Sequence, residues 1–176
     1  LEFMTGKKQS AEKFQQIHQS LLPREETLEI GKKRKQLNIG IPREVNKNEG
    51  RIAITPLAVE ELINAGHKVS IESNAGLGSN FGDIDYSECG AVIVDSKEEV
   101  FKTDIILKIS PLTLVEQGLL KQNQLVISAL NIGTQSEEYF RNLMRKKVTS
   151  VAFELITDEN NCQPVVRSMS EITGSS

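Results

Sequence analysis

Two glycines, Gly76 and Gly78, follow an expected strand and are the first residues with obvious chemical potential. A glycine-containing turn after a strand can bind the pyrophosphate of a dinucleotide, and Asp95 lies within about 20 residues, where an acid that binds the ribose belongs. The third small residue, which such a loop needs for close helix packing, is replaced by Phe81. The sequence therefore favours a tight turn with glycines at positive φ over a nucleotide site.

Arg51 lies in a polar stretch between an expected strand and an expected helix. Its planar guanidinium can bind a carboxylate bidentately and orient a reacting carbon. The same pattern is compatible with a solvated surface arginine. Glu44, earlier in the same stretch, can orient Arg51 or be solvated itself, and the sequence leaves both interpretations open.

Cysteine and histidine are too rare for a metal site or a nucleophile with its base. The chain has Cys89 and Cys162, without the short spacing of a zinc site, and His18 and His67. We expect two reduced thiols, as in a cytoplasmic protein, and no metal.

The chain from residue 37 onward alternates short apolar strands with amphipathic helices. Thr55 and Pro56, for example, are typical of a helix N-cap followed by proline at the first helical position. This alternation predicts an α/β fold with a mostly parallel sheet and helices on both faces. We expect strands over residues 37–41, 68–72, 91–94, 105–109, 125–128 and 148–153, and helices after residue 55 and around residues 84–89, 98–101, 114–120 and 137–145.

Both ends of the chain depart from this alternation. Residues 1–36 comprise a cloning scar and a helical extension, with helices expected over 9–21 and 25–35. Near the other end, a polar turn at 158–161 and a strand at 163–166 are expected to form a hairpin excursion over 154–166. Ser168 and Glu171 then have the spacing of a capping box at a helix start, so we expect a truncated helix.

Charge and hydropathy exclude several classes of function. The formal net charge of −3 argues against nucleic-acid binding through bulk electrostatics. No apolar run is long enough to cross a bilayer, and no signal peptide is recognisable, so direct membrane insertion is not expected.

Five segments in order along the chain strongly resemble the N-terminal domain of the alanine dehydrogenase/pyridine nucleotide transhydrogenase family. They are residues 39–56 (IGIPREVNKNEGRIAITP), 66–69 (GHKV), 74–79 (NAGLGS), 105–109 (IILKI) and 169–174 (MSEITG). The resemblance covers residues 38–174, and nothing before residue 37 takes part in it.

The resemblance implies that residues 37–176 form the flavodoxin-like N-terminal, substrate-side lobe of a two-lobed dehydrogenase. A Rossmann lobe that binds NAD would follow downstream, and the ligand would lie in the cleft between the lobes. The whole protein would be a homo-oligomeric oxidoreductase acting on a small 2-oxo or amino acid. The fragment alone is expected to be inactive and to bind no cofactor.

Particular residues take expected roles from the same resemblance. Arg51 matches the family arginine that binds the carboxylate of a 2-oxo acid, and Lys108 matches the first lysine of a K-x-K-E-P segment, so both are expected to bind substrate. Met169 and Glu171 match a stretch near the interlobe cleft and are expected near the cofactor. A capping box plus core packing is the competing interpretation of that pair.

Two residues depart from the alanine dehydrogenase pattern at its chemical centre. Ser110 replaces the second lysine of that segment, and Asn131 replaces the family histidine. Asparagine can hydrogen-bond a carbonyl oxygen but cannot exchange a proton near neutral pH, and serine lacks a fixed charge. Transhydrogenase nucleotide-binding subunits also lack both groups, whereas the MSE segment is closer to alanine dehydrogenases. The sequence therefore leaves three readings: an alanine dehydrogenase lobe, a transhydrogenase subunit domain, or a non-catalytic carboxylate-binding module.

Overall fold

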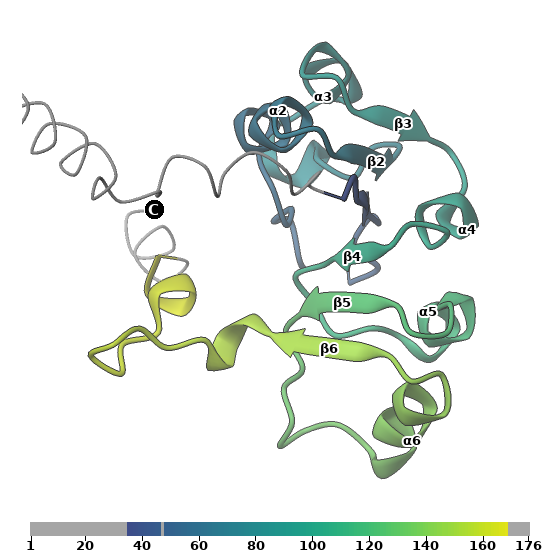
Figure 1. Cartoon of the computed structure of the whole chain (residues 1–176), viewed down its shortest axis with the longest axis vertical. Helices are drawn as coiled ribbons and strands as arrows, with labels where there is room; N and C mark the ends of the chain where they lie inside the picture. The colour runs from purple at the N-terminus through teal and green to yellow at the C-terminus, as the bar shows by residue number, and fades with distance from the viewer. Residues whose placement is uncertain (1–34, 47, 169–176) are drawn as a thin grey trace, which may run out of the picture. The chain divides into compact units, whose positions relative to one another are not determined.

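The computed structural model describes residues 35–46 and 48–168 (Figure 1). Residues 36–176 form one compact unit of the chain. The helix expected over 9–21 lies outside the described residues, as does the helix over 25–35 except for Lys35, which is not helical. Met169 and Glu171 also lie outside them.

Six parallel strands form one sheet in the order β3-β2-β1-β4-β5-β6. The strands are β1 (Asn38–Ile41), β2 (Lys68–Glu72), β3 (Val92–Val94), β4 (Ile105–Leu107), β5 (Leu125–Ser128) and β6 (Thr149–Ala152). The chain winds outward from β1 through β2 to β3, then crosses back to β4 and winds outward the other way. The carboxyl ends of the central strands β1 and β4 therefore flank the point where the order reverses, which is where open α/β sheets bind ligands.

Helices cover the two faces of the sheet, as the alternating pattern predicts (Figure 1). The helical segments are α2 (Pro56–Asn64), η2 (Leu77–Ser79), α3 (Asp83–Glu88), α4 (Lys97–Val100), α5 (Leu114–Leu119), α6 (Glu137–Arg145) and η3 (Phe153–Leu155). One apolar core joins β1 and β2 to α2 and α3, and a second joins β4 and β5 to α4 and α6. On β4, Ile106 belongs to the second core while Ile105 and Leu107 pack against the first, because successive strand residues point to opposite faces.

Side-chain caps fix where the helices begin. Thr55 accepts a hydrogen bond from the amide of Ala58, and Pro56 takes the first position of α2. Thr113 and Glu116 form a reciprocal capping box at the start of α5. Ser136 accepts from the amide of Tyr139 at the start of α6. These caps set the ends of the loops that follow the strands, and those loops carry the polar residues of interest.

The prediction for the end of the described chain is wrong in two respects. Residues 164–168 are helical, so the segment 163–166 is not a strand and forms no hairpin. Pro164 explains this, because its fixed φ and missing N–H suit the first turn of a helix and do not suit a strand ladder. Ser168 is not an N-cap, since it lies within this helix and its hydroxyl donates to the carbonyl of Pro164. No helix among the described residues is long and apolar enough to span a bilayer.

Candidate active site

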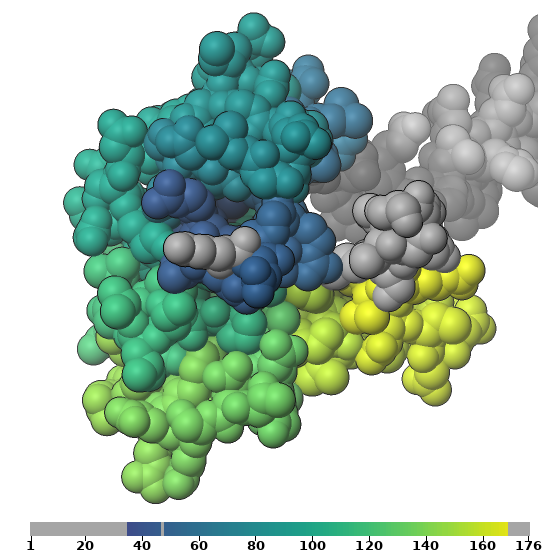
Figure 2. Space-filling view, turned by 180° about the vertical axis from the view of Figure 1, so that it is seen from behind, coloured from purple at the N-terminus to yellow at the C-terminus, as the bar shows by residue number. Residues whose placement is uncertain are grey.

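Two cavities open where the carboxyl ends of β1, β4 and β5 meet. The larger, about 620 Å³, is mostly apolar, and we call it the apolar cavity. The smaller, about 440 Å³, is more polar, and we call it the polar cavity. In Figure 2, β1 and the segment after it are purple and blue. They lie between the teal residues that follow them in the chain and the green residues further towards the C-terminus. Arg51 lines both cavities.

The polar cavity brings together three of the residues singled out in the sequence. Arg51 comes from the loop after β1, Ser110 from the segment after β4, and Asn131 from the segment after β5. Asn131 has a φ of 47°, in the left-handed region that asparagine tolerates better than most residues. A guanidinium, a hydroxyl and an amide thus share one hollow, which can bind a carboxylate together with a neighbouring carbonyl oxygen.

The guanidinium of Arg51 is paired with Glu49. Its Nε lies 2.7 Å from Oε1 and its Nη2 lies 2.6 Å from Oε2 of that carboxylate. The backbone amide of Arg51 also donates to Oε1, at 3.1 Å. The hydrogen bond from Arg51 lowers the pKa of Glu49, and the same bond raises the pKa of Arg51, so both groups are ionised at neutral pH.

A close backbone contact places the loop that carries Arg51. A Cβ added at Gly78 would lie 2.5 Å from the carbonyl oxygen of Gly50, so this approach requires glycine at residue 78. Ser79 adds a hydrogen bond from its hydroxyl to that carbonyl, at 2.9 Å. The glycine loop after β2 therefore packs against the loop after β1.

The same loop corrects one detail of the sequence prediction. Its glycines do not take positive φ, since Gly76 has a φ of −89° and the left-handed positions are Asn74 and Asn80. Glycine is needed for space instead: a Cβ at Gly76 would lie 2.7 Å from both Phe81 O and Tyr86 Cε2. The space next to Gly78, which a pyrophosphate would need, is filled by Gly50.

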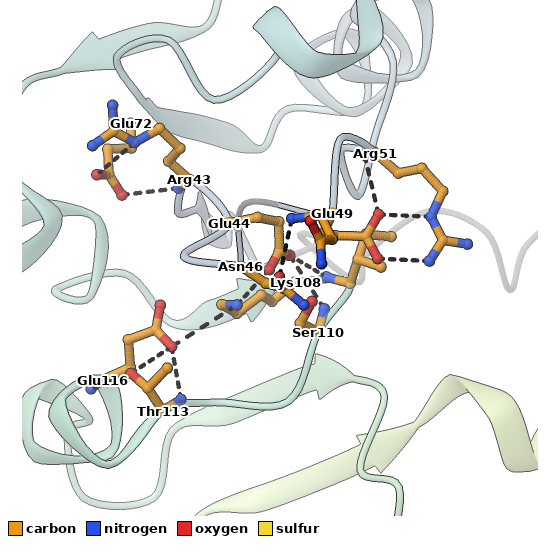
Figure 3. Close-up of polar contacts among 12 residues, drawn as sticks. Arg43, Glu44, Asn46, Glu49, Arg51, Glu72, Lys108, Ser110, Thr113 and Glu116 are labelled. Atoms are coloured by element: carbon orange, nitrogen blue, oxygen red, sulfur yellow. Dashed lines mark hydrogen bonds and ion pairs between the residues drawn. The ribbon is translucent and has the colours of Figure 1, made fainter.

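Lys108 is buried within a group of charges (Figure 3). Its ammonium lies 2.5 Å from Glu44 and 3.9 Å from Glu116, and its side chain is 1% exposed. Glu116 also forms an ion pair with Lys97 at 3.2 Å, and Lys97 forms a second ion pair with Glu72 at 3.8 Å. Lys108 also lines the apolar cavity, and in this structure its ammonium is paired with the two glutamates.

Glu44 holds the segment after β4 and does not orient Arg51 by direct contact. One oxygen accepts from the amides of Ile109 at 2.7 Å and Ser110 at 3.3 Å, while the other accepts from Lys108. Of the two interpretations that the sequence left open, neither describes this residue. Its carboxylate fixes the backbone of Ser110 at the wall of the polar cavity.

Glu154 plays the corresponding part after β5, although the sequence analysis did not single it out. Its Oε1 accepts from the amides of Leu130 at 2.7 Å and Asn131 at 2.9 Å. Its Oε2 is buried and has no hydrogen-bond partner among the described residues. The only available sequence signal is an acidic residue directly after a strand, at the carboxyl edge where such side chains meet.

Within residues 35–46 and 48–168, no group of three or more His, Cys, Asp or Glu side chains could hold a metal ion.

Comparison with known proteins shows the family to which the chain is similar. Residues 40–173 match the family described as "Alanine dehydrogenase/PNT, N-terminal domain". Alanine dehydrogenase of Staphylococcus saprophyticus is 35% identical over 136 residues, which are 77% of this chain and 36% of that protein. Alanine dehydrogenase 2 of Staphylococcus aureus is 35% identical over 138 residues, 78% of this chain and 37% of that protein.

Solved structures give the same picture. An L-alanine dehydrogenase superposes with a TM-score of 0.73 and 32% identity, over 76% of this chain and 37% of that one. A transhydrogenase from Sinorhizobium meliloti superposes with a TM-score of 0.63 and 29% identity, over 68% of this chain and 35% of that one. The chain thus spans little more than a third of the length of these relatives.

Proposed function

The chain belongs to the alanine dehydrogenase/PNT family, as its N-terminal domain, and from this premise we propose that Arg51 binds the carboxylate of a small 2-oxo or amino acid. The chain would then be the substrate-side lobe of an NAD(H)-dependent oxidoreductase resembling alanine dehydrogenase. The observation that carries this proposal is that Arg51, Ser110 and Asn131 line one cavity at the reversal point of the sheet. A carboxylate on the arginine would leave the adjacent carbonyl within the same hollow.

Each of the three residues has a distinct part in the proposal. Arg51 orients the ligand through its carboxylate. Ser110 and Asn131 can donate hydrogen bonds to the oxygen on the second carbon, but neither can exchange a proton near neutral pH. A proton for the reaction would therefore come from solvent or from a group outside the described residues. Lys108 would stabilise this wall of the site rather than touch the ligand.

The glycine loop after β2 does not fit the pyrophosphate of a dinucleotide. The glycine loop after β2 is packed against Gly50, where a Cβ at Gly78 would already meet backbone at 2.5 Å. NAD, which would supply the hydride chemistry, is therefore proposed to bind a segment beyond the described chain. Met169 and Glu171 are proposed to lie on that side of the site, and a domain boundary is proposed near residue 37.

Binding of pyruvate to the present chain tests the role of Arg51. We expect Arg51→Lys to weaken pyruvate binding about tenfold or more, because lysine cannot reproduce a planar bidentate contact. Arg141→Lys is the matched control, since Arg141 also pairs with a glutamate, Glu137, but lies on α6. Isothermal titration calorimetry measures both. Equal pyruvate affinities for the Arg51→Lys variant and the parent chain would remove Arg51 from the site.

A transhydrogenase-type function is a second candidate, supported by Ser110 and Asn131 in place of lysine and histidine and by the structural likeness. A carboxylate-binding module without catalysis is a third. The whole protein separates them. NADH oxidation with pyruvate and ammonium indicates the first function, hydride exchange between two nicotinamide nucleotides the second, and pyruvate binding without turnover the third. A cytoplasmic homo-oligomer is proposed in each case, and native mass spectrometry of the whole protein tests the oligomer.

A further inference from the structure

The site proposed for a ligand carboxylate is already occupied by a carboxylate of the chain itself. Glu49 takes the Nε and Nη2 edge of Arg51 at 2.7 and 2.6 Å, which is the bidentate geometry that a bound acid would adopt. The side chain of Glu49 is 13% exposed, while that of Arg51 is 51% exposed. The arginine therefore reaches solvent with one edge satisfied.

The charged residues around the polar cavity also oppose the binding of a second carboxylate at Arg51. Among the described residues that line it, Arg51 is the one cationic residue, and Glu49 and Glu154 are the acidic ones. Of these described side chains, a carboxylate that enters the cavity meets one positive and two negative charges. At close range such a charge pattern weakens the attraction that an isolated guanidinium would exert.

We propose that Glu49 is an internal competitor for the carboxylate-binding edge of Arg51 and thereby lowers the affinity of the site for every ligand that binds through a carboxylate. The inference rests on the proposed function, because it concerns the same ligand group. A ligand must either displace Glu49 or bind beside it against its charge. Ligands that also bond to Ser110 and Asn131 can offset this cost, whereas a plain carboxylate such as acetate cannot.

Glu49→Gln tests the competitor directly. The amide oxygen of glutamine can still accept from Nε and from the backbone amide of Arg51, so the loop keeps its main hydrogen bonds while the negative charge is lost. We expect pyruvate to bind this variant about fivefold or more tightly than the parent chain, since even an exposed charge pair contributes on the order of that factor. Acetate, which binds through its carboxylate alone, should gain by a similar factor.

Glu137→Gln is the matched control. Glu137 also pairs with an arginine, at 2.7 Å, but on the exposed surface of α6 and away from both cavities. We expect it to leave pyruvate affinity unchanged. Thermal unfolding of each variant shows that it is folded, and the NMR signal of the Arg51 Nε–H gives a second measurement. In the parent chain that signal should shift when pyruvate displaces Glu49.

The outcomes separate the two proposals. Unchanged or weaker pyruvate binding by folded Glu49→Gln overturns the competitor, while loss of binding in Arg51→Lys leaves the carboxylate site intact as a proposal. If the double variant Glu49→Gln, Arg51→Lys binds pyruvate as tightly as Glu49→Gln alone, the carboxylate is not held by Arg51 and the proposed function fails as well. Tighter binding by Glu49→Gln that the second substitution abolishes supports both.

Discussion

Glu44 and Glu154 hold neighbouring strand ends in the same way but with different electrostatic surroundings. Each uses one oxygen to accept from two consecutive backbone amides, those of residues 109 and 110 for Glu44 and those of residues 130 and 131 for Glu154. The second oxygen of Glu44 faces the ammonium of Lys108 at 2.5 Å. The second oxygen of Glu154 has no partner among the described residues.

The difference separates two contributions that a single carboxylate usually combines. Holding two amides requires only an acceptor at the right place, which a neutral side chain can also supply. Balancing a buried cation requires the charge. The strand end that carries Ser110 should therefore depend on ionisation, and the strand end that carries Asn131 should depend mainly on hydrogen bonding.

Lys108→Met is expected to reduce the free energy of unfolding most among these variants. It removes the cation that is paired with Glu44, whereas Glu154 has no such cation among the described residues. Glu44 and Glu116 would stay buried with their charges incompletely compensated, and breaking a buried pair in this way costs about 3–5 kcal/mol. Urea denaturation measures the loss. Lys121→Met is the control, since Lys121 is exposed. Equal stability of the two variants would show that the buried charges near β4 are not coupled as the distances indicate.

Glu44→Gln is expected to cost less, about 2–3 kcal/mol, because glutamine can still accept from the amides of Ile109 and Ser110. The loss arises from Lys108, which keeps only Glu116 at 3.9 Å. Restoring stability by the double change Lys108→Met, Glu44→Gln would confirm that the two charges act as a pair. Simple addition of the two losses would contradict it.

Tyr86→Phe sharpens the comparison with a contact that involves no charge near neutral pH. The Tyr86 hydroxyl donates to the carbonyl of Ile54 at 2.9 Å and so ties α3 to the segment that follows Arg51. Loss of this bond should cost about 1 kcal/mol near neutral pH.

The same tyrosine predicts a dependence on alkaline pH. Burial raises its pKa from 10.0 to about 12, so its contribution is complete below pH 10 and is lost as the pH rises towards 12. Tyr86→Phe should reduce the loss of stability over this range, and urea denaturation at several pH values checks it. Part of the loss should remain, because burial also raises the pKa of Tyr139. An identical alkaline loss in the variant would exclude Tyr86 as a cause.

Glu154→Gln is expected to have the smallest effect, within about 1 kcal/mol of the parent chain. Its amide oxygen can accept from Leu130 and Asn131 as the carboxylate does, and no described cation loses a partner. Thermal unfolding of Glu154→Gln beside Glu44→Gln compares the two directly. A loss for Glu154→Gln as large as that for Glu44→Gln would show that the charge of Glu154 stabilises its strand end as much as that of Glu44 does.

Most of the fold could be predicted from the sequence, because its signals are local. Alternating apolar strands and capped helices identify the α/β sheet, and Thr55 with Pro56 marks the start of α2. The strand predicted over residues 163–166 is wrong because Val165 and Val166 favour a strand, whereas Pro164 before them favours the first turn of a helix. The prediction of positive φ for Gly76 and Gly78 is wrong. These glycines are needed because Phe81 and Gly50 leave no space for a side chain, and such tertiary contacts cannot be read from the local sequence.

The candidate site could be predicted only in part. The resemblance to a known family singled out Arg51, Ser110 and Asn131, which line one cavity. The contacts that position them join residues far apart in the chain, since 65 positions separate Glu44 from Ile109 and 24 separate Leu130 from Glu154. No local pattern encodes such pairs. The pairing of Arg51 with Glu49 is local, but its geometry depends on the loop conformation that Gly50 and Gly78 allow.

Glu44 and Glu154 both accept hydrogen bonds from main-chain amides and not from side chains at the positions they hold. The backbone positions of Ser110 and Asn131 are held by carboxylates from distant parts of the chain, and the side chains of these two residues take no part in the hydrogen bonds. A different side chain at residue 110 would therefore be presented from the same backbone position, whereas the φ of 47° at Asn131 restricts the residues that can replace it. The chemistry of this edge of the sheet can thus change more easily at residue 110 than at residue 131.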